Sequence, residues 1–299
     1  MIDYIKAYFP ERDEILNLMR ENYTLEKINY TRFDKKENEI ISYETYKQNF
    51  ENMELKITNK EAYIHNSIHH FYNRAVYGVD GNFNDFRHSN LVNSIDFLED
   101  RIKLSSDKLY LSQGLEFGLN LKVPFDIDQF ILHECILYDF SEVSKFPQPT
   151  EEQVYKEFEK GNYRLKIYNK GRQQCKNLES ILRIEIKFLD KRDFNKKGIY
   201  VLSDLEKKDN LYFLYDKLFT LIKSKLMCVD NIEGGNFTNY KKTKLYKYCS
   251  PKFWAESNKD KFKLESRKVF PYFEKNKLLE HKKVLLTLMD SKFIELLES

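Results

Sequence analysis

The sequence predicts an α+β protein with an antiparallel sheet, helices on one face of that sheet, and a helical C-terminal region. Two short segments, 163–171 and 182–188, alternate apolar and polar residues with a period of two, which is typical of half-buried strands. A third segment, 115–122, alternates in the same way. Further along the chain the apolar spacing becomes helical. We therefore expect an α+β domain over 1–202 and a helical, basic region over 203–299.

The N-terminal part is predicted to mix helix and strand. Residues 12–22 have the apolar spacing of a helix, whereas residues 25–33 and 53–58 are typical of strands. Residues 62–69 are expected to form a further strand that runs into a polar loop over 78–86. The sheet is thus expected to draw strands from the first seventy residues as well as from the middle of the chain.

Helices and loops are predicted between the central strands. Residues 90–104 have helical spacing, and a proline ends the strand over 115–122. An aspartate cap followed by apolar residues predicts a helix over 128–138. Two prolines predict a loop over 145–152.

The C-terminal third is predicted to be helical. Residues 203–206, Ser-Asp-Leu-Glu, resemble a capping box before the apolar run over 211–222. Residues 231–236 contain two glycines and read as a connection. Residues 259–298 are expected to form one or two helices, broken at Pro271.

Basic residues are concentrated near the C-terminus, although the formal net charge of the chain is only +3. Residues 236–283 contain 14 Lys or Arg and 5 Asp or Glu, so the rest of the chain is net acidic. Aromatic residues are interleaved among these cations, which suits a polyanion partner. A lysine-rich helix face turned to solvent is the alternative. The candidate DNA-binding residues in this segment are Lys241, Lys242, Lys244 and Lys247.

Cysteine spacing and hydropathy bound the setting of the protein. The four cysteines form no Cys-x-x-Cys pair, so neither a zinc site nor a disulfide framework is expected, and reduced thiols in a cytosol fit best. Residues 1–6 show neither a basic leader nor a long apolar run, so no signal peptide is expected. No stretch approaches the roughly 20 apolar residues of a membrane span. A cytoplasmic protein without a membrane partner is predicted.

Polar side chains gather on one face of the three central strands. Its members are Arg164, Lys166, Tyr168 and Lys170, then Arg183, Glu185 and Lys187, and finally Glu116 and Asn120. If these strands pair, two carboxylates with oxygen-rich neighbours suit Mg²⁺ or Mn²⁺, and a tyrosine can serve as a covalent nucleophile. The alternative is that these residues form the solvent-facing sides of amphipathic strands.

Histidines form a second candidate cluster. His65, Ser67 and His69 alternate along the predicted strand, and histidines at such positions can share a metal ion. Surface or core histidines are the alternative. The loop that follows contains Asn82 and Asn84, which suit either a polar turn or a contact with phosphate or metal.

The order of these segments resembles the replication initiation proteins of rolling-circle plasmids and filamentous phages. The resemblance covers roughly residues 62–205. The matching motifs are Tyr168-Asn-Lys-Gly171 followed by Arg183-Ile-Glu-Ile186, Asn66-Ser-Ile-His69 with Gly81-Asn82, and the acidic strand Leu115-Glu-Phe-Gly-Leu-Asn120. The His–apolar–His motif of many such nucleases is missing. The Gly–Ser/Arg signature around the plasmid nucleophile is also absent, since Val154-Tyr-Lys-Glu157 stands there.

The resemblance implies a nuclease-like domain that binds an origin and nicks one DNA strand through a tyrosine with divalent metal, leaving a 5′-phosphotyrosine link and a 3′-OH primer. The family's metal-binding acidic positions would map to Glu116 and Glu185. His69, from the histidine cluster, is a further candidate metal ligand. The candidate nucleophiles are Tyr155, then Tyr163, with Tyr168 as a competitor that belongs to the motif itself. Expected DNA contacts on the sheet are Lys166, Lys170 and Arg183. Expected partners are origin duplex and single strand, a host helicase and polymerase, and a second copy of the chain.

Two other functions use the same residues. A restriction-type metal nuclease would use Glu185-Ile-Lys187 with Glu116 or Asp139 as the acidic partner. In that reading Lys187 is catalytic and stabilises the charged transition state, and no covalent adduct forms. A non-catalytic DNA-binding protein would need only the basic C-terminal region.

Overall fold

The computed structural model describes residues 1–34, 38–143, 153–174, 181–230 and 237–298. The α+β fold with an antiparallel sheet and a helical C-terminal region is confirmed. Strands of the first sheet follow the order β2 (Glu26–Asp34), β3 (Glu39–Phe50), β4 (Met53–Ile57), β5 (Ala62–Ser67), β1 (Tyr4–Phe9) and β6 (Tyr110–Leu111). The second sheet has the order β7 (Glu116–Lys122), β11 (Ile181–Phe188), β10 (Tyr163–Asn169) and β9 (Tyr155–Lys160).

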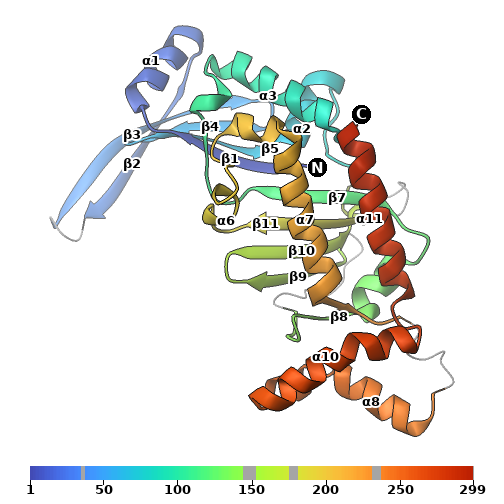
Figure 1. The fold of residues 1–299 in the computed structure, drawn as a ribbon. Coiled ribbons are helices and arrows are strands. Elements are labelled where there is room, and N and C mark those ends of the chain that lie inside the picture. Colours follow the sequence, from blue (N-terminus) through green and yellow to red (C-terminus); the bar gives the residue numbers. More distant parts are fainter. Residues whose placement is uncertain (35–37, 144–152, 175–180, 231–236, 299) are drawn as a thin grey trace.

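The two sheets meet edge to edge where the chain enters β1. Ile2 forms an antiparallel bridge with Phe117, and the amide of Asp3 donates to the carbonyl of Glu116 at 3.0 Å. Figure 1 shows the result as one long stack of strands, with β7 following β1. A separate pair consists of β8 (Cys135–Tyr138) and β12 (Leu226–Cys228).

Helices fill the connections and the C-terminal third. They are α1 (Arg12–Asn22), α2 (Ile68–Tyr72), α3 (His88–Ile102), α4 (Ile127–Gln129), α5 (Lys170–Gln174), α6 (Arg192–Asn195), α7 (Lys208–Lys225), α8 (Asn239–Cys249), α9 (Pro251–Ala255), α10 (Lys259–Lys275) and α11 (Glu280–Glu298). Short π-helical turns, η1 (Asn73–Tyr77) and η3 (Phe130–Glu134), extend α2 and α4, and η2 (Ser106–Lys108) and η4 (Leu202–Glu206) are 3₁₀ turns. None of the described helices is long and apolar enough to cross a membrane.

One core runs through the sheets and continues into the C-terminal third. Helices α7 and α11 lie side by side across one face of the second sheet (Figure 1), where Phe293 stacks on Tyr215 at 4.1 Å and meets Phe117 edge-on at 6.2 Å. A second, smaller core around Tyr248 and Trp254 joins α8, α9 and α10 to the β8–β12 pair. The boundary expected at residue 202 therefore runs through the main core, because α7 and α11 complete the cover of the sheet.

Several predicted elements differ from those observed, and long-range pairing explains the largest difference. The helix predicted over 128–138 is instead α4, a π-helical turn and β8, because Cys135–Tyr138 pairs with β12 some ninety residues later. Strands β1, β3, β6, β9 and β12 were not predicted. Pro271 lies inside α10 and does not break it, whereas the helix boundary lies at 276–279, where Lys277 has a φ of 53°.

Smaller differences concern the ends of elements. The segment predicted as a strand over 62–69 leaves the sheet at Ser67, whose hydroxyl accepts from the amide of His70 and so begins α2. The expected capping box at 203–206 is a 3₁₀ turn, and α7 begins after it, at Lys208. The loop predicted over 145–152 and the connection predicted over 231–236 lie outside the described residues.

Candidate metal and tyrosine site

The register of the second sheet places the predicted polar residues on one face. Lys166 pairs with Glu185 and Tyr168 with Arg183 between β10 and β11. Lys187 pairs with Glu116, and Arg183 with Asn120, between β11 and β7. Residues directly opposite each other in an antiparallel pair share a face. The sequence-based prediction of a common polar face is therefore confirmed.

The centre of this face is buried, and the surrounding members of the face are partly buried. Arg183 is 2% exposed, Tyr168 6% and Glu185 8%. A charge withdrawn from water in this way needs a partner. The alternative of an ordinary solvated strand face is therefore wrong for the centre of this sheet.

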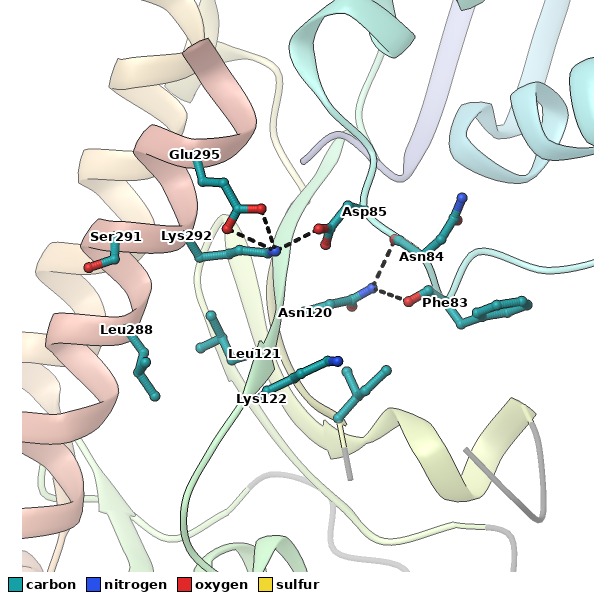
Figure 2. A pocket seen from close by; sticks show the side chains of 11 residues that line it. Phe83, Asn84, Asp85, Asn120, Leu121, Lys122, Leu288, Ser291, Lys292 and Glu295 are labelled. Carbon is teal, nitrogen blue, oxygen red and sulfur yellow. Dashed lines mark hydrogen bonds and ion pairs between the residues drawn. The ribbon is translucent and has the colours of Figure 1, made fainter. Parts of the chain in front are cut away.

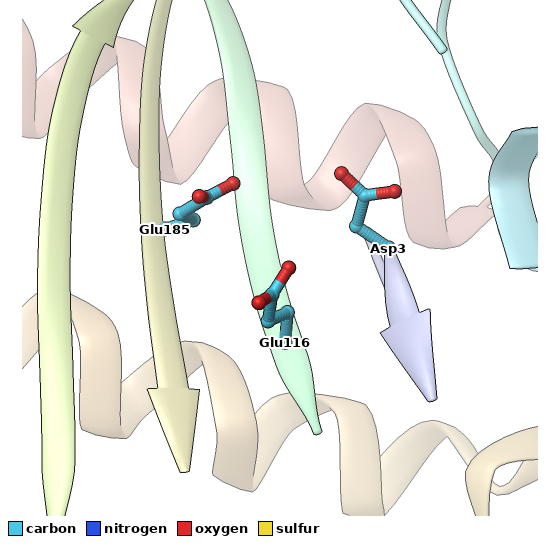
Figure 3. A group of neighbouring side chains, drawn as sticks. All are labelled: Asp3, Glu116 and Glu185. Carbon is cyan, nitrogen blue, oxygen red and sulfur yellow. The ribbon is translucent and has the colours of Figure 1, made fainter. Parts of the chain in front are cut away.

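Three carboxylates form the centre of the site. Ligand oxygens of Asp3, Glu116 and Glu185 all lie within 4.8 Å of one another, from three neighbouring strand segments (Figure 3). Glu116 and Glu185 were candidate metal ligands of the sequence analysis, on the condition that their strands pair. Asp3 was not predicted, because a single carboxylate near the start of the chain carries no motif, and only the edge-to-edge joining of the sheets brings it here.

Arg183 connects two of these carboxylates. Its guanidinium donates to Asp3 Oδ2 and to Glu185 Oε2, each at 2.8 Å, and to Asn120 Oδ1 at 2.9 Å. The predicted DNA-contacting role of Arg183 is therefore not what its contacts indicate, since its acceptors among the described residues all lie inside the site. Arg183 holds Asp3 and Glu185 at a fixed spacing.

The chain segments around Asp3 supply further hydrogen bonds. Ser67 donates to Asp3 Oδ1, and the amide of Asn82 donates to both oxygens at 2.9 Å. The ammonium of Lys170, predicted as a DNA contact, donates to Asn82 Oδ1 at 2.6 Å. Lys170 is buried, which lowers its pKa to about 8, with nearby Arg183 acting in the same direction. Lys170 is thus part of the support for Asp3.

The three carboxyl groups differ in their tendency to ionise. Burial opposes ionisation of Asp3, but Arg183 and then Lys170 outweigh it and hold the Asp3 pKa well below its usual range. Burial raises the pKa of Glu116, and the neighbouring charge of Glu185 adds to this rise, against the opposing effect of Lys187. A group whose pKa is raised by burial and by a second carboxylate is one that a cation would stabilise in its ionised form.

The donor set fits a divalent cation. Ligand oxygens of one Mg²⁺ or Mn²⁺ lie roughly 2.0–2.6 Å from the ion, so two ligands of the same ion are at most about 5 Å apart. Arg183 donates to Oε2 of Glu185, and Lys187 donates to Oε1 of Glu116. The second oxygen of each carboxylate accepts no hydrogen bond from any described residue. Asp3, Glu116 and Glu185 are the residues that would hold the ion.

A glycine lets the strands approach closely at this point. Gly118 on β7 stands opposite Glu185 on β11. A Cβ atom at Gly118 would lie 2.7 Å from both the Cβ of Glu185 and the carbonyl oxygen of Ile184. Any side chain here would push β11 away from β7, so Gly118 sets the spacing on which the carboxylate group depends.

Tyr168 contacts the carboxylate group directly. Its hydroxyl donates to Glu185 Oε2 at 3.3 Å, and Lys166 Nζ lies 4.6 Å from its ring centroid. Burial, followed by the charge of Glu185, raises the pKa of Tyr168 well above its ordinary value. Because a phenol with a raised pKa ionises less readily, Tyr168 is better suited to holding Glu185 than to acting as a nucleophile.

Tyr155 lies opposite Tyr168 and is more accessible. The two residues pair between β9 and β10, so they share the polar face, and Lys166 Nζ lies 5.2 Å from the ring centroid of Tyr155. Tyr155 is only partly buried and lines a cavity of about 100 Å³ together with Lys166, Tyr168, Asn169 and Gln173. Tyr155 is thus partly open to solvent, lies beside a lysine and shares the sheet face of the carboxylates.

Tyr163 lies on the opposite face, away from the carboxylate group, which argues against the predicted role as nucleophile. Its hydroxyl is within 2.7 Å of the hydroxyl of Tyr138, and both rings are buried in the main core. The strand period of two explains this, because Tyr163 differs in parity from Lys166 and Tyr168. Tyr163 is a core residue.

His69 lies beside the site but outside the group of mutually close ligands. It is on α2, and its Nε2 is 2.7 Å from Asn84 Oδ1. Burial lowers its pKa to about 3. The prediction that His65, Ser67 and His69 share a strand face fails because the strand ends at Ser67. His69 is therefore a neutral core histidine, and its ring stacks on that of Phe86 with the centroids 4.6 Å apart.

The remaining predicted residues divide between the site and the periphery. Lys187 donates to Glu116 Oε1 at 2.7 Å, so it borders the carboxylate group. Asp139, the alternative acidic partner, pairs instead with Lys225 at 3.2 Å and is absent from that group. On α8, Lys241 and Lys242 are exposed, Lys244 lies over the ring of Tyr272, and Lys247 pairs with Glu265.

A cavity of about 490 Å³ borders the site through Asn120. Figure 2 shows it between α11 and the segment Phe83–Asp85, with Lys292 held between Asp85 and Glu295. The amide of Asn120 donates to the carbonyl of Phe83 at 3.2 Å, and its oxygen accepts from Arg183. One side chain therefore belongs to both the cavity wall and the support of the carboxylates.

Comparison with known proteins adds no relative to this description. No protein-family model matches the chain, and a search of curated proteins finds no match.

Proposed function

We propose that this protein is a DNA replication initiator that binds an origin and nicks one strand through Tyr155, with Mg²⁺ or Mn²⁺ held by Asp3, Glu116 and Glu185. The observation that carries the proposal is that a three-carboxylate group shares one sheet face with an accessible tyrosine beside a lysine. Carboxylate oxygens with a nearby phenol suit transfer of a phosphodiester to a side chain.

In the reaction one phosphorus–oxygen bond forms and another breaks. The hydroxyl oxygen of Tyr155 attacks the phosphorus and loses its proton, the bond to the 3′ oxygen breaks, and that oxygen takes up a proton. The products are a 5′-phosphotyrosine link and a 3′-OH end. Lys166, whose ammonium faces the rings of both Tyr155 and Tyr168, would stabilise the developing phenolate. When bound, the cation would polarise the phosphate and stabilise the leaving oxygen.

The remaining residues of the face would position these groups. Tyr168 and Arg183 both donate to Glu185 Oε2 and so fix the position of this carboxylate. Lys187 compensates the charge of Glu116. The exposed lysines of α8 would contact phosphates of the duplex, which position a protein on DNA without reading sequence.

The test is a nicking assay with Mn²⁺ or Mg²⁺ on supercoiled DNA that carries the protein's own gene and its flanks, followed by a denaturing protein gel. A band shift that resists denaturant is expected for the unaltered protein and for Tyr163→Phe, which is the matched control on the opposite face. The shift should disappear in Tyr155→Phe and in Glu185→Gln.

Other outcomes would change the identity of the nucleophile or overturn the proposed mechanism. An adduct that is lost only in Tyr168→Phe would keep the initiator class and move the nucleophile. Cleavage with no adduct in any variant would overturn the covalent mechanism. Salt-sensitive binding without cleavage under either metal would overturn the enzymatic proposal.

A metal nuclease without a covalent intermediate is the second candidate. It is favoured by the position of Lys187, which lies on the same face as Glu185 and within 2.7 Å of Glu116. In such an enzyme water is the attacking group, and Lys187 stabilises charge in the transition state. Cleavage that survives Tyr155→Phe and Tyr168→Phe but not Lys187→Met would establish it.

A further inference from the structure

The outer face of the first sheet carries tyrosines and lysines that the proposed site does not use. Burial alternates strictly along β1 and β4, so one face packs into the core while the other stays partly open. Three tyrosines lie in a row across β5, β1 and β6, where Tyr8 pairs with both Tyr63 and Tyr110. We call Tyr8, Tyr63 and Tyr110, with Lys6 and Lys191, the tyrosine face.

The rings of the tyrosine face are close neighbours. The centroid of Tyr8 is 5.6 Å from that of Tyr110 and 6.5 Å from that of Tyr63. Tyr8 and Tyr63 are half-buried and Tyr110 is 42% exposed. Aromatic rings in a row on an open sheet are the arrangement on which successive bases of a single strand stack.

Two lysines of this face have tyrosine rings as their partners rather than carboxylates. Lys6 Nζ lies 4.8 Å from the ring centroid of Tyr63, and Lys191 Nζ lies 5.3 Å from that of Tyr8. Neither forms an ion pair with any residue in the part of the chain that the structure describes. Cations interleaved with rings in this way complement a phosphate backbone whose bases lie on the rings.

A series of neighbouring residues leads from the tyrosine face toward the carboxylate group. Lys187, which pairs with Glu116, lies 4.7 Å from the ring centroid of Tyr4. The ring of Tyr4 stacks near His65 at 6.4 Å, and His65 stands opposite Lys6 between β5 and β1. A strand lying on the tyrosine face would therefore reach the acidic site along β1.

We propose that the tyrosine face binds single-stranded nucleic acid, with bases stacked on Tyr8, Tyr63 and Tyr110 and phosphates on Lys6 and Lys191. That the bound strand is the one delivered to the carboxylates rests on the proposed nicking function. The binding itself does not, because rings and cations suffice to hold a single strand without metal or cleavage.

The test is the affinity of the full chain for labelled oligo(dT), measured by fluorescence anisotropy in EDTA so that no cleavage takes place. Tyr110→Leu should weaken binding roughly tenfold, and a variant with Tyr8→Leu as well should weaken it further, since each stacked base contributes about a tenfold factor or more. Tyr110→Phe should bind as the unaltered protein does, because stacking needs the ring and not the hydroxyl.

The matched control is Tyr212→Leu. Tyr212 is 43% exposed, close to the value for Tyr110, but lies on α7 against Phe293, on the side of the sheet that the helices cover. Oligo(dT) affinity should not change in this variant. Thermal unfolding of each variant separates loss of binding from loss of fold, and Lys191→Gln provides a test at an exposed position that leaves the sheet intact.

The outcomes separate this inference from the proposed function. Tyrosine-dependent binding of oligo(dT) with no adduct on any DNA would support the tyrosine face and leave nicking without support. An adduct together with unchanged oligo(dT) affinity in Tyr110→Leu and Lys191→Gln would overturn the tyrosine face. Equal loss of oligo(dT) and duplex binding would also overturn it, as the surface would then be a general polyanion site. Tighter binding of oligo(rU) than oligo(dT) would assign the face to RNA.

Discussion

The polar face of the second sheet and the helices α8–α10 contain the same kinds of residue in opposite surroundings. On the sheet, Arg183 and Glu185 are buried and each is bonded to several neighbours. On the helices, Lys241, Lys242 and Tyr240 are exposed, Tyr240 to 76%. Exposed charges are solvated and contribute little to stability, whereas a buried charge depends on its partner. Sequence composition alone does not distinguish these two cases.

The largest expected effect is the loss of a buried cation from the sheet. Arg183→Met leaves Asp3 and Glu185 close together and without their shared partner, which should lower the free energy of unfolding by about 3 to 5 kcal/mol. Urea denaturation at neutral pH measures this. Arg192→Met is the matched control, because Arg192 is exposed and its ion-pair partner among the described residues is the nearby Asp190, so this variant should leave the free energy of unfolding nearly unchanged. Equal losses of stability in the two variants would show that burial does not make Arg183 more important than an exposed arginine.

A second effect follows from the burial of His69. Burial keeps its pKa at about 3, whereas an unfolded histidine has a pKa of about 6.5. As the pH falls below 6.5, the unfolded state gains a proton that the folded state does not. The stability contributed by His69 is therefore complete above pH 6.5 and is lost progressively down to about pH 3.

The histidine effect can be isolated by comparing variants. His69→Phe keeps the stacking on Phe86 and removes the titration, so the loss of stability between pH 7 and pH 5 should be smaller than in the unaltered protein. Each pKa unit corresponds to about 1.4 kcal/mol, so a difference of one to two kcal/mol is expected over that range. An identical pH dependence in His69→Phe would refute the burial argument.

A third effect tests the spacing of the strands. Gly118→Ala places a Cβ 2.7 Å from the backbone of Ile184, and overpacking of this kind costs about 1 to 3 kcal/mol. Because the same displacement moves Glu185 relative to Glu116, binding of Mn²⁺ measured by calorimetry should weaken more than in Asn120→Ala, which leaves the strand spacing alone. Unaltered Mn²⁺ binding in Gly118→Ala would show that the two carboxylates do not share an ion.

The polar face could be predicted because its information is local. A strand period of two over seven or eight residues fixes which side chains share a face, and the pairing of Lys166 with Glu185 follows once β10 and β11 meet. The burial of that face could not be predicted, since it depends on Asp3 and Asn82, which are distant in sequence. His69 was misplaced because one side-chain cap at Ser67 turns a strand into a helix.

The smallest effect on stability is expected where the lysines are exposed. Lys241→Gln with Lys242→Gln removes two charges of α8 that form no ion pair among the described residues, so the free energy of unfolding should change by less than about 0.5 kcal/mol. Binding to duplex DNA should nevertheless weaken, and the slope of log affinity against log salt should fall by about 0.9 for each lost phosphate contact. Oligo(dT) binding in EDTA should stay constant, because the tyrosines of the tyrosine face lie on β1, β5 and β6 and not on α8. A fall in stability without a change in the salt slope would mean that these lysines stabilise the fold, as the buried charges of the sheet do. The contrast between the sheet and the helices would then not hold.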